Sequence, residues 1–328
     1  MDRAKILAMI DVAGGRGLEI GALMKPIVTK DMGRIEYVDR ASTEELRRWY
    51  ANQGHVDPSE VVEVDHVWGS QTLLACVGGQ RSYDYVVASH VIEHIPDLLG
   101  WLQEIASVLA DGGIASLAVP DKRYTFDVLR RTSSASELVD AYVRGLRRPD
   151  PRQLFDHFMG YRDVDSEAIR SGRVLPADVP SQHDPRELME TCRRTLTTGE
   201  YIDAHCWVFT PKSFVQALEL GSRLGVLPFE IAAFFPTGHG AHEFFVSLRR
   251  LPDTWTPEAR RDAFVASRQR LAPPDAGGES AVDALTRRVA AAEAELTALR
   301  NSTSWRITAP LRRLVSAWRR LARGPRGA

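Results

Sequence analysis

The first half of the chain alternates short apolar runs with segments whose apolar residues recur every three or four positions. The apolar runs predict buried strands, and the helical spacing predicts helices between them. Strands are expected at Gly17–Ile20, Arg34–Val38, Val61–Val64, Tyr85–Ala88 and Ile114–Val119. Helices are expected at Thr43–Tyr50, Leu73–Cys76 and Ile92–Leu109, the last one stopped by Gly112 and Gly113.

This alternation is typical of an α/β fold with a parallel sheet and helices on both faces. It resumes after residue 205, with a helix from Pro211 to about Leu224 and closing strands at 227–235 and 243–248. Residues 128–205 are instead polar and interrupted by prolines, with helical stretches near 135–147 and 186–197. We interpret them as a helical cap inserted over the strand ends, a position where such segments complete substrate pockets.

The end of the chain has a different composition. Residues 251–278 predict a helix and a linker, and residues 279–328 predict a helical tail. The tail begins with the seam of a short coiled coil, about two and a half heptads long, and continues as a basic amphipathic stretch. From Pro273 onward, ten arginines face five acidic residues, a net charge of +5, which leaves −6 for the preceding residues. We expect only the tail to seek an anionic partner, such as a membrane face.

The overall composition narrows the class of protein. A hydrophobic content of 44% is ordinary for a globular protein, and there is no apolar run long enough to cross a bilayer. Cys76, Cys192 and Cys206 have neither disulfide-framework nor zinc-site spacing. We therefore expect a cytoplasmic protein, or one held peripherally on the inner membrane face. The acidic body lacks a basic stripe, which argues against nucleic acid as a partner.

Polar residues follow the predicted strands, and ligands of open α/β sheets bind at that edge. Gly21 ends the first strand, but Ala22 and Leu23 follow it, so the G-x-G-x-x-G cradle of a dinucleotide is missing. Asp39 is placed to accept hydrogen bonds from two ribose hydroxyls, and Asp65 is placed to accept one from an adenine amino group. With Glu19 near an α-ammonium, this combination describes S-adenosylmethionine (SAM).

Taken in order, Glu19-Ile20-Gly21, Asp39, Asp65 and the run from Tyr83 to His94 resemble the motifs of class I SAM-dependent methyltransferases. The resemblance implies a Rossmann-like seven-stranded sheet, with an antiparallel last strand, formed by residues 1–127 and 206–250. It also implies SAM as cofactor. The implied cofactor contacts are Glu19, Gly21, Asp39, Arg40, Asp65, Ser89 and His90. In addition, Asn301–Arg312 resembles a segment near the ends of bacterial surface-polysaccharide glycosyltransferases and their partner enzymes.

His90-Val91-Ile92-Glu93-His94 also matches the H-x-x-E-H pattern of zinc proteases. That pattern needs a helix on both sides, whereas a strand ends at Ala88 and Pro96 follows closely, so we reject proteolysis. The three residues could form a metal site with His157 or His205. We instead expect no metal here, with His94 packed under the sheet and hydrogen-bonded to the backbone.

Methyl transfer to an alcohol needs a proton acceptor, and His205 or His157 is the expected base. Lys122, Arg123, Tyr124 and Asp127 follow a strand and are expected to bind the substrate. The sequence thus predicts a methyltransferase that O-methylates a sugar of a cell-surface polysaccharide or glycoconjugate. Two alternatives remain open: a small-molecule or lipid methyltransferase of the same fold, and a non-catalytic scaffold in a glycan-synthesis assembly.

Overall fold

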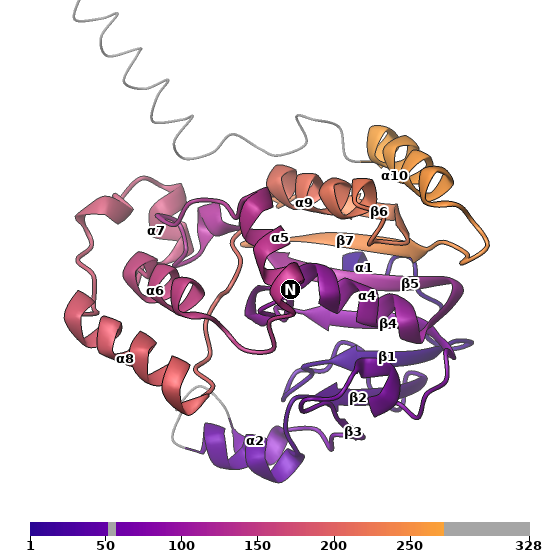
Figure 1. Ribbon diagram of the computed structural model, residues 1–328, viewed down its shortest axis with the longest axis horizontal. Coiled ribbons are helices and arrows are strands. Elements are labelled where there is room, and N and C mark those ends of the chain that lie inside the picture. Colours follow the sequence, from indigo (N-terminus) through magenta and orange to yellow (C-terminus); the bar gives the residue numbers. More distant parts are fainter. Residues whose placement is uncertain (52–56, 272–328) are drawn as a thin grey trace, which may run out of the picture. The chain divides into compact units, whose positions relative to one another are not determined.

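A seven-stranded mixed sheet forms the centre of the computed structural model, which describes residues 1–51 and 57–271 (Figure 1). The strand order is β3-β2-β1-β4-β5-β7-β6, and β7 runs antiparallel to both of its neighbours while the other pairs are parallel. The strands are β1 (Arg16–Ile20), β2 (Arg34–Asp39), β3 (His66–Val67), β4 (Tyr83–Ser89), β5 (Leu109–Pro120), β6 (Phe229–Phe235) and β7 (Glu243–Arg250). The predicted seven-stranded sheet, with its antiparallel last strand, is confirmed.

Helices connect the strands and carry most of the remaining described chain. The α-helices are α1 (Arg3–Ile6), α2 (Thr43–Tyr50), α3 (Leu73–Cys76), α4 (Leu98–Val108), α5 (Ala135–Arg144), α6 (Pro151–Gly160), α7 (Ser166–Arg170), α8 (Pro185–Thr198), α9 (Pro211–Arg223) and α10 (Pro257–Leu271). Short 3-10 helices are η1 (Pro58–Glu60), η2 (Ile92–His94), η3 (Lys122–Tyr124) and η4 (Pro176–Asp178). The helix predicted at Thr43–Tyr50 has these same bounds, because Ser42 and Glu45 form a reciprocal capping box.

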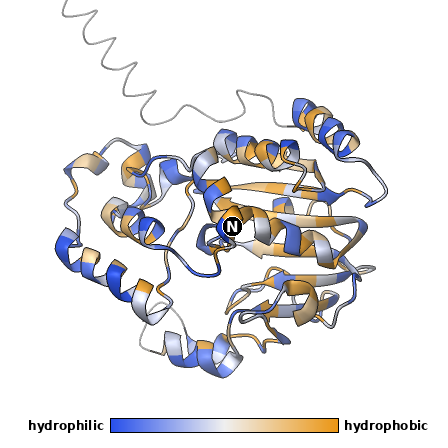
Figure 2. Ribbon diagram, viewed as in Figure 1, coloured by the Kyte–Doolittle hydropathy of each residue, from blue (hydrophilic) through white to orange (hydrophobic). Residues whose placement is uncertain are grey.

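The two faces of the sheet are covered differently. One face packs on α3, α4, α5, α9 and α10 through a large apolar cluster that includes Leu102, Trp207 and Phe214. The other face is covered by α1 and the coil that links β1 to β2, through Ile6, Val28 and their neighbours. Figure 2 shows the strands as mainly hydrophobic, as expected for a sheet buried on both faces.

Two predicted elements differ from the structure, for local reasons. The strand expected at Val61–Val64 is wrong: the Val62 N–H bonds Leu23, and the Val64 N–H bonds the Thr43 hydroxyl, so β3 forms only at His66–Val67. The helix expected from Ile92 to Leu109 divides at Pro96 into η2 and α4. Gly112 and Gly113 do not stop that helix, since they lie in β5 beside an irregularity in its pairing with β4.

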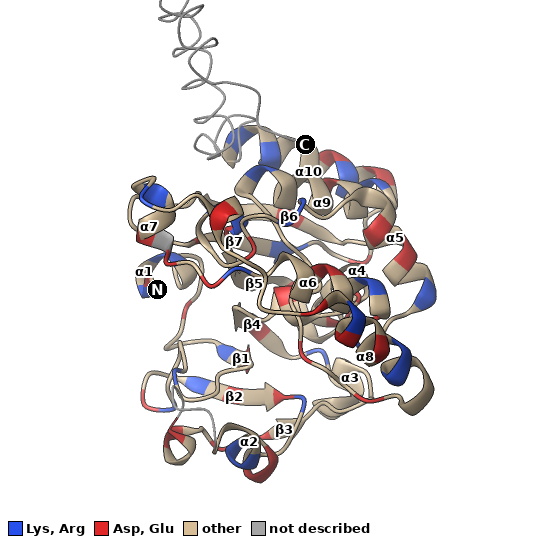
Figure 3. Cartoon of the chain, turned by 90° about the vertical axis from the view of Figure 1, so that its left-hand side faces the viewer, with Lys and Arg blue, Asp and Glu red and all other residues tan. Residues whose placement is uncertain are grey.

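Helices α5 to α8 lie in residues 128–205, the segment between the central strands and the closing strands. Helices α6 and α8 pack against each other through Leu154, Leu188 and Cys192. Acidic and basic residues stand side by side along α2 and α8, which is usual for solvated helix faces (Figure 3).

In the described ranges, no helix has the length and apolar character needed to span a membrane. The predicted coiled coil and basic tail, residues 279–328, lie outside the described residues.

Candidate functional site

A cavity of about 940 Å³ opens where strands β1, β2 and β4 end. Its floor is formed by Ile20, Gly21 and Asp39, and its sides by α2, η2, α4 and α5. Tyr201 and Asp203, which follow α8 at the end of residues 128–205, line another side of it. Ligands of open α/β sheets bind at this edge, so the cavity is the candidate active site.

Gly21 makes the turn that ends β1. Its φ of +70° lies in the left-handed region, and a Cβ at this position would stand 2.8 Å from Cγ2 of Val91. Only glycine combines that conformation with so close an approach. A single glycine therefore gives the bare backbone that a cofactor needs at this turn, without the missing glycine-rich cradle.

Asp39 is the last residue of β2 and lines the cavity. Its carboxylate accepts the N–H of Arg40 at 2.7 Å, and no side-chain donor reaches it within the described ranges. Burial raises the pKa of Asp39 to about 6, against the opposing effect of that N–H. A part-buried carboxylate with spare acceptor capacity fits a pair of ribose hydroxyls, so the residues present fit SAM.

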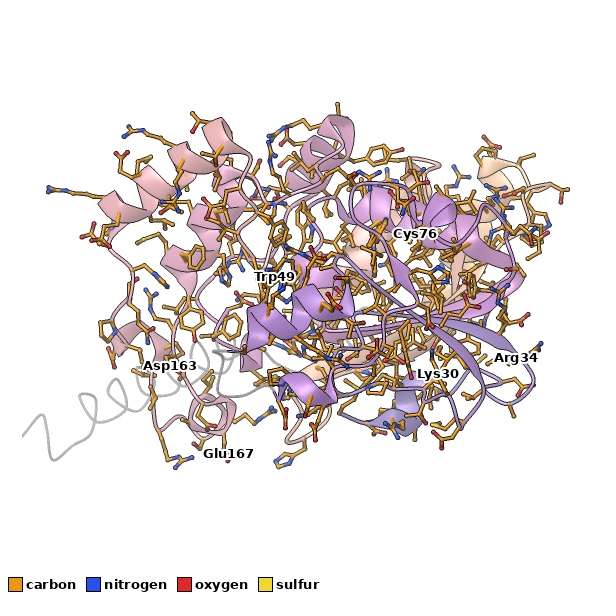
Figure 4. All side chains as sticks on the ribbon, turned by 90° about the horizontal axis from the view of Figure 1, so that it is seen from below. Lys30, Arg34, Trp49, Cys76, Asp163 and Glu167 are labelled. Carbon is orange, nitrogen blue, oxygen red and sulfur yellow. The ribbon has the colours of Figure 1, made fainter. Side chains whose placement is uncertain are left out.

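Arg40 holds the neighbouring wall through stacking. Its guanidinium carbon lies 3.4 Å from the ring centre of Tyr201 and 4.6 Å from that of Trp49. In Figure 4 the labelled Trp49 lies between Lys30 on one side and Asp163 of the inserted segment on the other. The stack thus joins the end of β2 to the end of residues 128–205, and both rings line the cavity.

Three of the predicted cofactor residues are not among those that line the cavity. Glu19 is buried and accepts the backbone N–H groups of Ile27 at 2.7 Å and Val28 at 3.0 Å, so it fixes the coil that follows β1. Burial raises its pKa to about 7. Asp65 accepts from the Tyr37 N–H and from Lys30 Nζ, both at 2.8 Å. Ser89 Oγ lies 3.7 Å from the sulfur of Met1.

His90 does line the cavity and adopts a left-handed φ of +53°, which is uncommon for a residue other than glycine. Its Nε2 lies 2.7 Å from Glu243, and its Nδ1 lies 3.4 Å from Oε1 of Glu93. Burial would lower the pKa of His90, but the two carboxylates outweigh it and raise the pKa to about 10. The structure therefore places a cationic imidazole at the end of β4.

Two histidine–carboxylate pairs meet beside this wall. His94 Nδ1 lies 3.0 Å from Asp203, and His205 Nδ1 lies 2.6 Å from Asp127. The two rings contact edge to face, with centroids 4.8 Å apart. The expectation that His94 bonds the backbone is therefore wrong, because Asp203 supplies its partner. The segment carrying His205 is held in place by the Cys206 N–H, which bonds the carbonyl of Glu93 at 2.6 Å.

Of the predicted bases, neither His205 nor His157 lines the cavity, whereas His94 and Asp203 do. His157 is buried and accepts the backbone N–H of His205 at 3.2 Å. Burial lowers the pKa of His157 to about 3, and the nearby His205 adds to this effect. His157 therefore supports the position of His205 in this structure.

The four predicted substrate residues also lie away from the cavity lining. Lys122 Nζ donates to the carbonyl of Val128, and the buried Arg123 binds Asp121 through several guanidinium hydrogen bonds. Tyr124 stacks under Arg170, whose guanidinium carbon lies 4.0 Å from the ring centre. Asp127 is buried between His205 and Arg130. These side chains organise the loop after β5.

Sequence reasoning missed most of the cavity wall. Trp49, Trp68, Trp101 and Tyr201 line it, and the buried indole N–H groups of Trp68 and Trp101 have no hydrogen-bond partner in the described ranges. These residues come from four distant segments, and no spacing in the sequence connects them. The pair His94–Asp203 had a local signal, because Tyr201, Asp203 and His205 alternate directly before the sheet resumes.

Comparison with solved structures gives weak overall similarity. A mitomycin 7-O-methyltransferase is 13% identical, with 76% of this chain and 52% of that one covered and a TM-score of 0.35. A SAM-dependent methyltransferase from Mesorhizobium loti is 14% identical, with 75% and 95% covered and a TM-score of 0.36. A protein from Rhodobacter sphaeroides described as a putative zinc-dependent alcohol dehydrogenase is 13% identical, with 76% and 89% covered and a TM-score of 0.40.

The chain spans about half the length of the first solved structures that it matches. Similarity at these identities and TM-scores carries no functional argument. Among curated proteins, none matches this chain.

A family model gives the decisive comparison. The model described as "Methyltransferase domain" matches residues 7–220, well over half of the chain, including the strand ends that line the cavity. This match agrees with the methyltransferase domain that the sequence predicts. The protein belongs to the methyltransferase-domain family.

Proposed function

We propose that this methyltransferase transfers the methyl group of SAM to a hydroxyl of a sugar in a cell-surface polysaccharide or related glycoconjugate. The observation that carries the proposal is the lining of the cavity. Aromatic side chains stand beside the carboxylates and imidazoles of Asp39, His90, His94 and Asp203. A sugar ring presents apolar C–H faces and many hydroxyls, and such a lining matches both.

SAM, when bound, supplies an electrophilic methyl group. The residues of this chain hold the acceptor and remove its proton. Asp39 and Gly21 would hold the cofactor, and the pair His94–Asp203, which lines the cavity, is placed to accept the proton. The pair His205–Asp127 supports it through the ring contact between the two histidines. In each pair the carboxylate accepts the Nδ1–H, which orients the ring and leaves Nε2 as the atom that can accept a proton.

The tail carries a second part of the proposal, which concerns location. Residues 279–328 are basic and amphipathic in sequence, and we propose that they dock the enzyme on the inner membrane face or on a glycosyltransferase. The methyl acceptor would then be presented on a lipid-linked glycan. A version of the protein that ends at residue 278 should still bind SAM but lose its association with anionic vesicles.

A transfer assay tests the acceptor class. SAM labelled in its methyl group is incubated with the protein and with nucleotide-sugars, isolated surface glycans, phenols or phospholipids in parallel. The proposal expects label in the sugar-containing acceptors, at an oxygen identified by mass spectrometry. Label only in phenols or phospholipids favours the small-molecule or lipid alternative. SAM binding without transfer to any acceptor favours the scaffold.

A further inference from the structure

Glu93, His94 and His205 form a small cluster beside the cavity that could bind a metal ion. One of its oxygen atoms is buried without a hydrogen-bond partner in the described ranges. One ligand atom from each of Glu93, His94 and His205 lies within 4.8 Å of the others. Two imidazoles and one carboxylate form a donor set that divalent transition metals favour in proteins. The proposed methyl transfer uses the two histidines only as proton acceptors, and it gives Glu93 no role.

This oxygen atom is Oε2 of Glu93. Glu93 is 2% exposed, and its Oε1 faces Nδ1 of His90 at 3.4 Å, but Oε2 is buried without any hydrogen-bond partner in the described ranges. Leaving a buried carboxylate oxygen without a donor costs about 1–3 kcal/mol or more. A proton on His94 would satisfy Asp203 but would give Oε2 no partner. A cation between Glu93 and the two rings would.

Both histidines are already held as metal ligands usually are. The second ring nitrogen of a metal-bound imidazole commonly donates its N–H to a carboxylate. This hydrogen bond fixes the orientation of the ring and makes the metal-binding nitrogen more basic. Here Asp203 holds Nδ1 of His94, and Asp127 holds Nδ1 of His205. Neither Nε2 forms a hydrogen bond within the described ranges, so both remain available. Asp127 is itself fixed by Arg130 at 2.8 Å.

The charges around the cluster favour a cation. Glu93, Asp127 and Asp203 surround the two rings, and Arg130 offsets only one of the three carboxylates. His90 also faces Glu93, but it is paired with Glu243 on its other nitrogen. The net charge around the three ligand atoms is therefore negative.

We propose that Glu93, His94 and His205 bind one divalent first-row transition-metal cation, through Oε2 and the two Nε2 atoms. Metal–nitrogen distances of about 2.1 Å require the three side chains to move slightly together on binding. His94 lines the cavity, so the open coordination position faces it. A bound cation would lower the pKa of an acceptor hydroxyl by coordinating its oxygen, and the released proton would pass to solvent water, because both Nε2 atoms would then bind the metal. The site itself does not depend on the proposed acceptor.

Titration of the full-length protein tests this directly. Protein stripped with EDTA is titrated calorimetrically with Zn²⁺ and with Mn²⁺, and Co²⁺ is added separately to record its visible absorption bands. We expect one cation per chain, and Co²⁺ bands that report nitrogen and oxygen ligands. Glu93→Gln removes the charge at constant shape and should abolish binding or weaken it at least tenfold.

Two further variants separate the site from general effects. Asp203→Asn acts at a carboxylate that is 63% exposed, so it should fold normally, and it should weaken binding about tenfold. His242→Ala changes the other histidine–carboxylate cluster, formed with His90 and Glu243, and should leave the affinity unchanged. The proposal is overturned if the wild-type protein binds no cation, if Asp203→Asn binds as the wild type does, or if His242→Ala removes the binding.

Discussion

Two aspartates that follow strands of the same sheet have opposite environments. Asp39 ends β2 and lines the cavity, where in the described ranges it accepts one hydrogen bond, from the N–H of Arg40. Partial burial raises its pKa to about 6. Asp127 follows β5 and is also buried, but His205 and Arg130 outweigh that burial and lower its pKa to about 2. The Asp39 carboxylate can still accept hydrogen bonds from a ligand, whereas the Asp127 carboxylate is occupied by its hydrogen bonds to His205 and Arg130.

This difference predicts opposite effects on stability, and they are the largest expected. Asp127→Asn removes one of the two carboxylate partners of the buried Arg130 and the charged partner of His205, and it should destabilise the protein by about 1.5–3 kcal/mol for each lost charged hydrogen bond. Asp39→Asn removes a charge that burial disfavours, so at pH 7 it should leave the free energy of unfolding unchanged or slightly higher. Urea unfolding of both variants measures the contrast. An equal loss of unfolding free energy in the two variants would contradict the proposed difference between Asp39 and Asp127.

The turn after β1 gives the next largest effect. Gly21→Ala imposes a left-handed φ on alanine, at about 1–2 kcal/mol, and places its Cβ against Val91. Gly112→Ala is the matched control, because Gly112 has a φ of +79° but nothing within 4 Å of its Cβ position. Both variants should melt earlier, and only Gly21→Ala should also lose SAM affinity in calorimetric titration. Similar affinity in the two would show that the turn does not contact the cofactor.

The pH dependence of SAM binding should follow Asp39. Its pKa of about 6 in the free protein means that the carboxylate is protonated below this pH and accepts hydroxyl hydrogen bonds poorly. Affinity should be constant above about pH 7 and should fall as the pH drops through 6, by up to about tenfold per unit. Titrations from pH 5 to 8 measure this, and Asp39→Asn should flatten the profile. A profile unchanged by that variant would assign the titration to another group.

Asp127 should behave differently in acid. Its pKa is lowered from the usual value of 3.8 to about 2, so the stability that it contributes is present above about pH 4 and is lost as the pH falls toward 2. Acid unfolding of the wild type should therefore include a loss in this range. Asp127→Asn should lack that loss, because it has no carboxylate to protonate.

The stack on Arg40 should have the smallest effect. Arg40→Ala removes contacts with Tyr201 and Trp49 that are worth about 0.5–1 kcal/mol each at an exposed site. We expect a few-fold loss of SAM affinity and a small drop in melting temperature. Arg131→Ala, at a residue whose side chain is 81% exposed, is the control and should change neither quantity. An Arg40→Ala protein with wild-type affinity would exclude the stack from the binding site.

Much of the fold was predictable because the spacing of apolar residues along the sequence differs between buried strands and helices. The predicted strands at Gly17–Ile20, Arg34–Val38 and Tyr85–Ala88 all lie within β1, β2 and β4. The start of α2 is predicted by the capping residues Ser42 and Glu45. Helix α6 was missed although the same kind of signal was present, with Asp150 at the N-cap, Pro151 at the first turn and Gln153 completing a capping box. Strand β3 was misplaced because hydrogen bonds to Leu23 and Thr43 compete with pairing to β2.

The candidate site was only partly predictable, because strand ends are easier to find than side-chain directions. Glu19 and Asp39 both stand near the ends of neighbouring strands, but Glu19 is paired in register with Tyr37, two residues before Asp39. Residues two apart on a strand point to the same face, so Asp39 differs from Glu19 in standing two positions nearer the carboxyl edge of the sheet, where the cavity opens. Asp39 therefore reaches the cavity, and Glu19 binds the backbone of the adjacent coil instead.

The most direct measurement of the central claim is calorimetric titration of SAM into the wild type, Asp39→Asn and Asp65→Asn at pH 7.5. A hydrogen bond to a charged group contributes about 1.5–3 kcal/mol, so Asp39→Asn should bind SAM roughly 10- to 100-fold more weakly. Asp65→Asn should bind nearly as the wild type does, because its carboxylate is engaged by Tyr37 and Lys30 away from the cavity. Loss of affinity in Asp65→Asn, with Asp39→Asn unaffected, would contradict this assignment of the cofactor site.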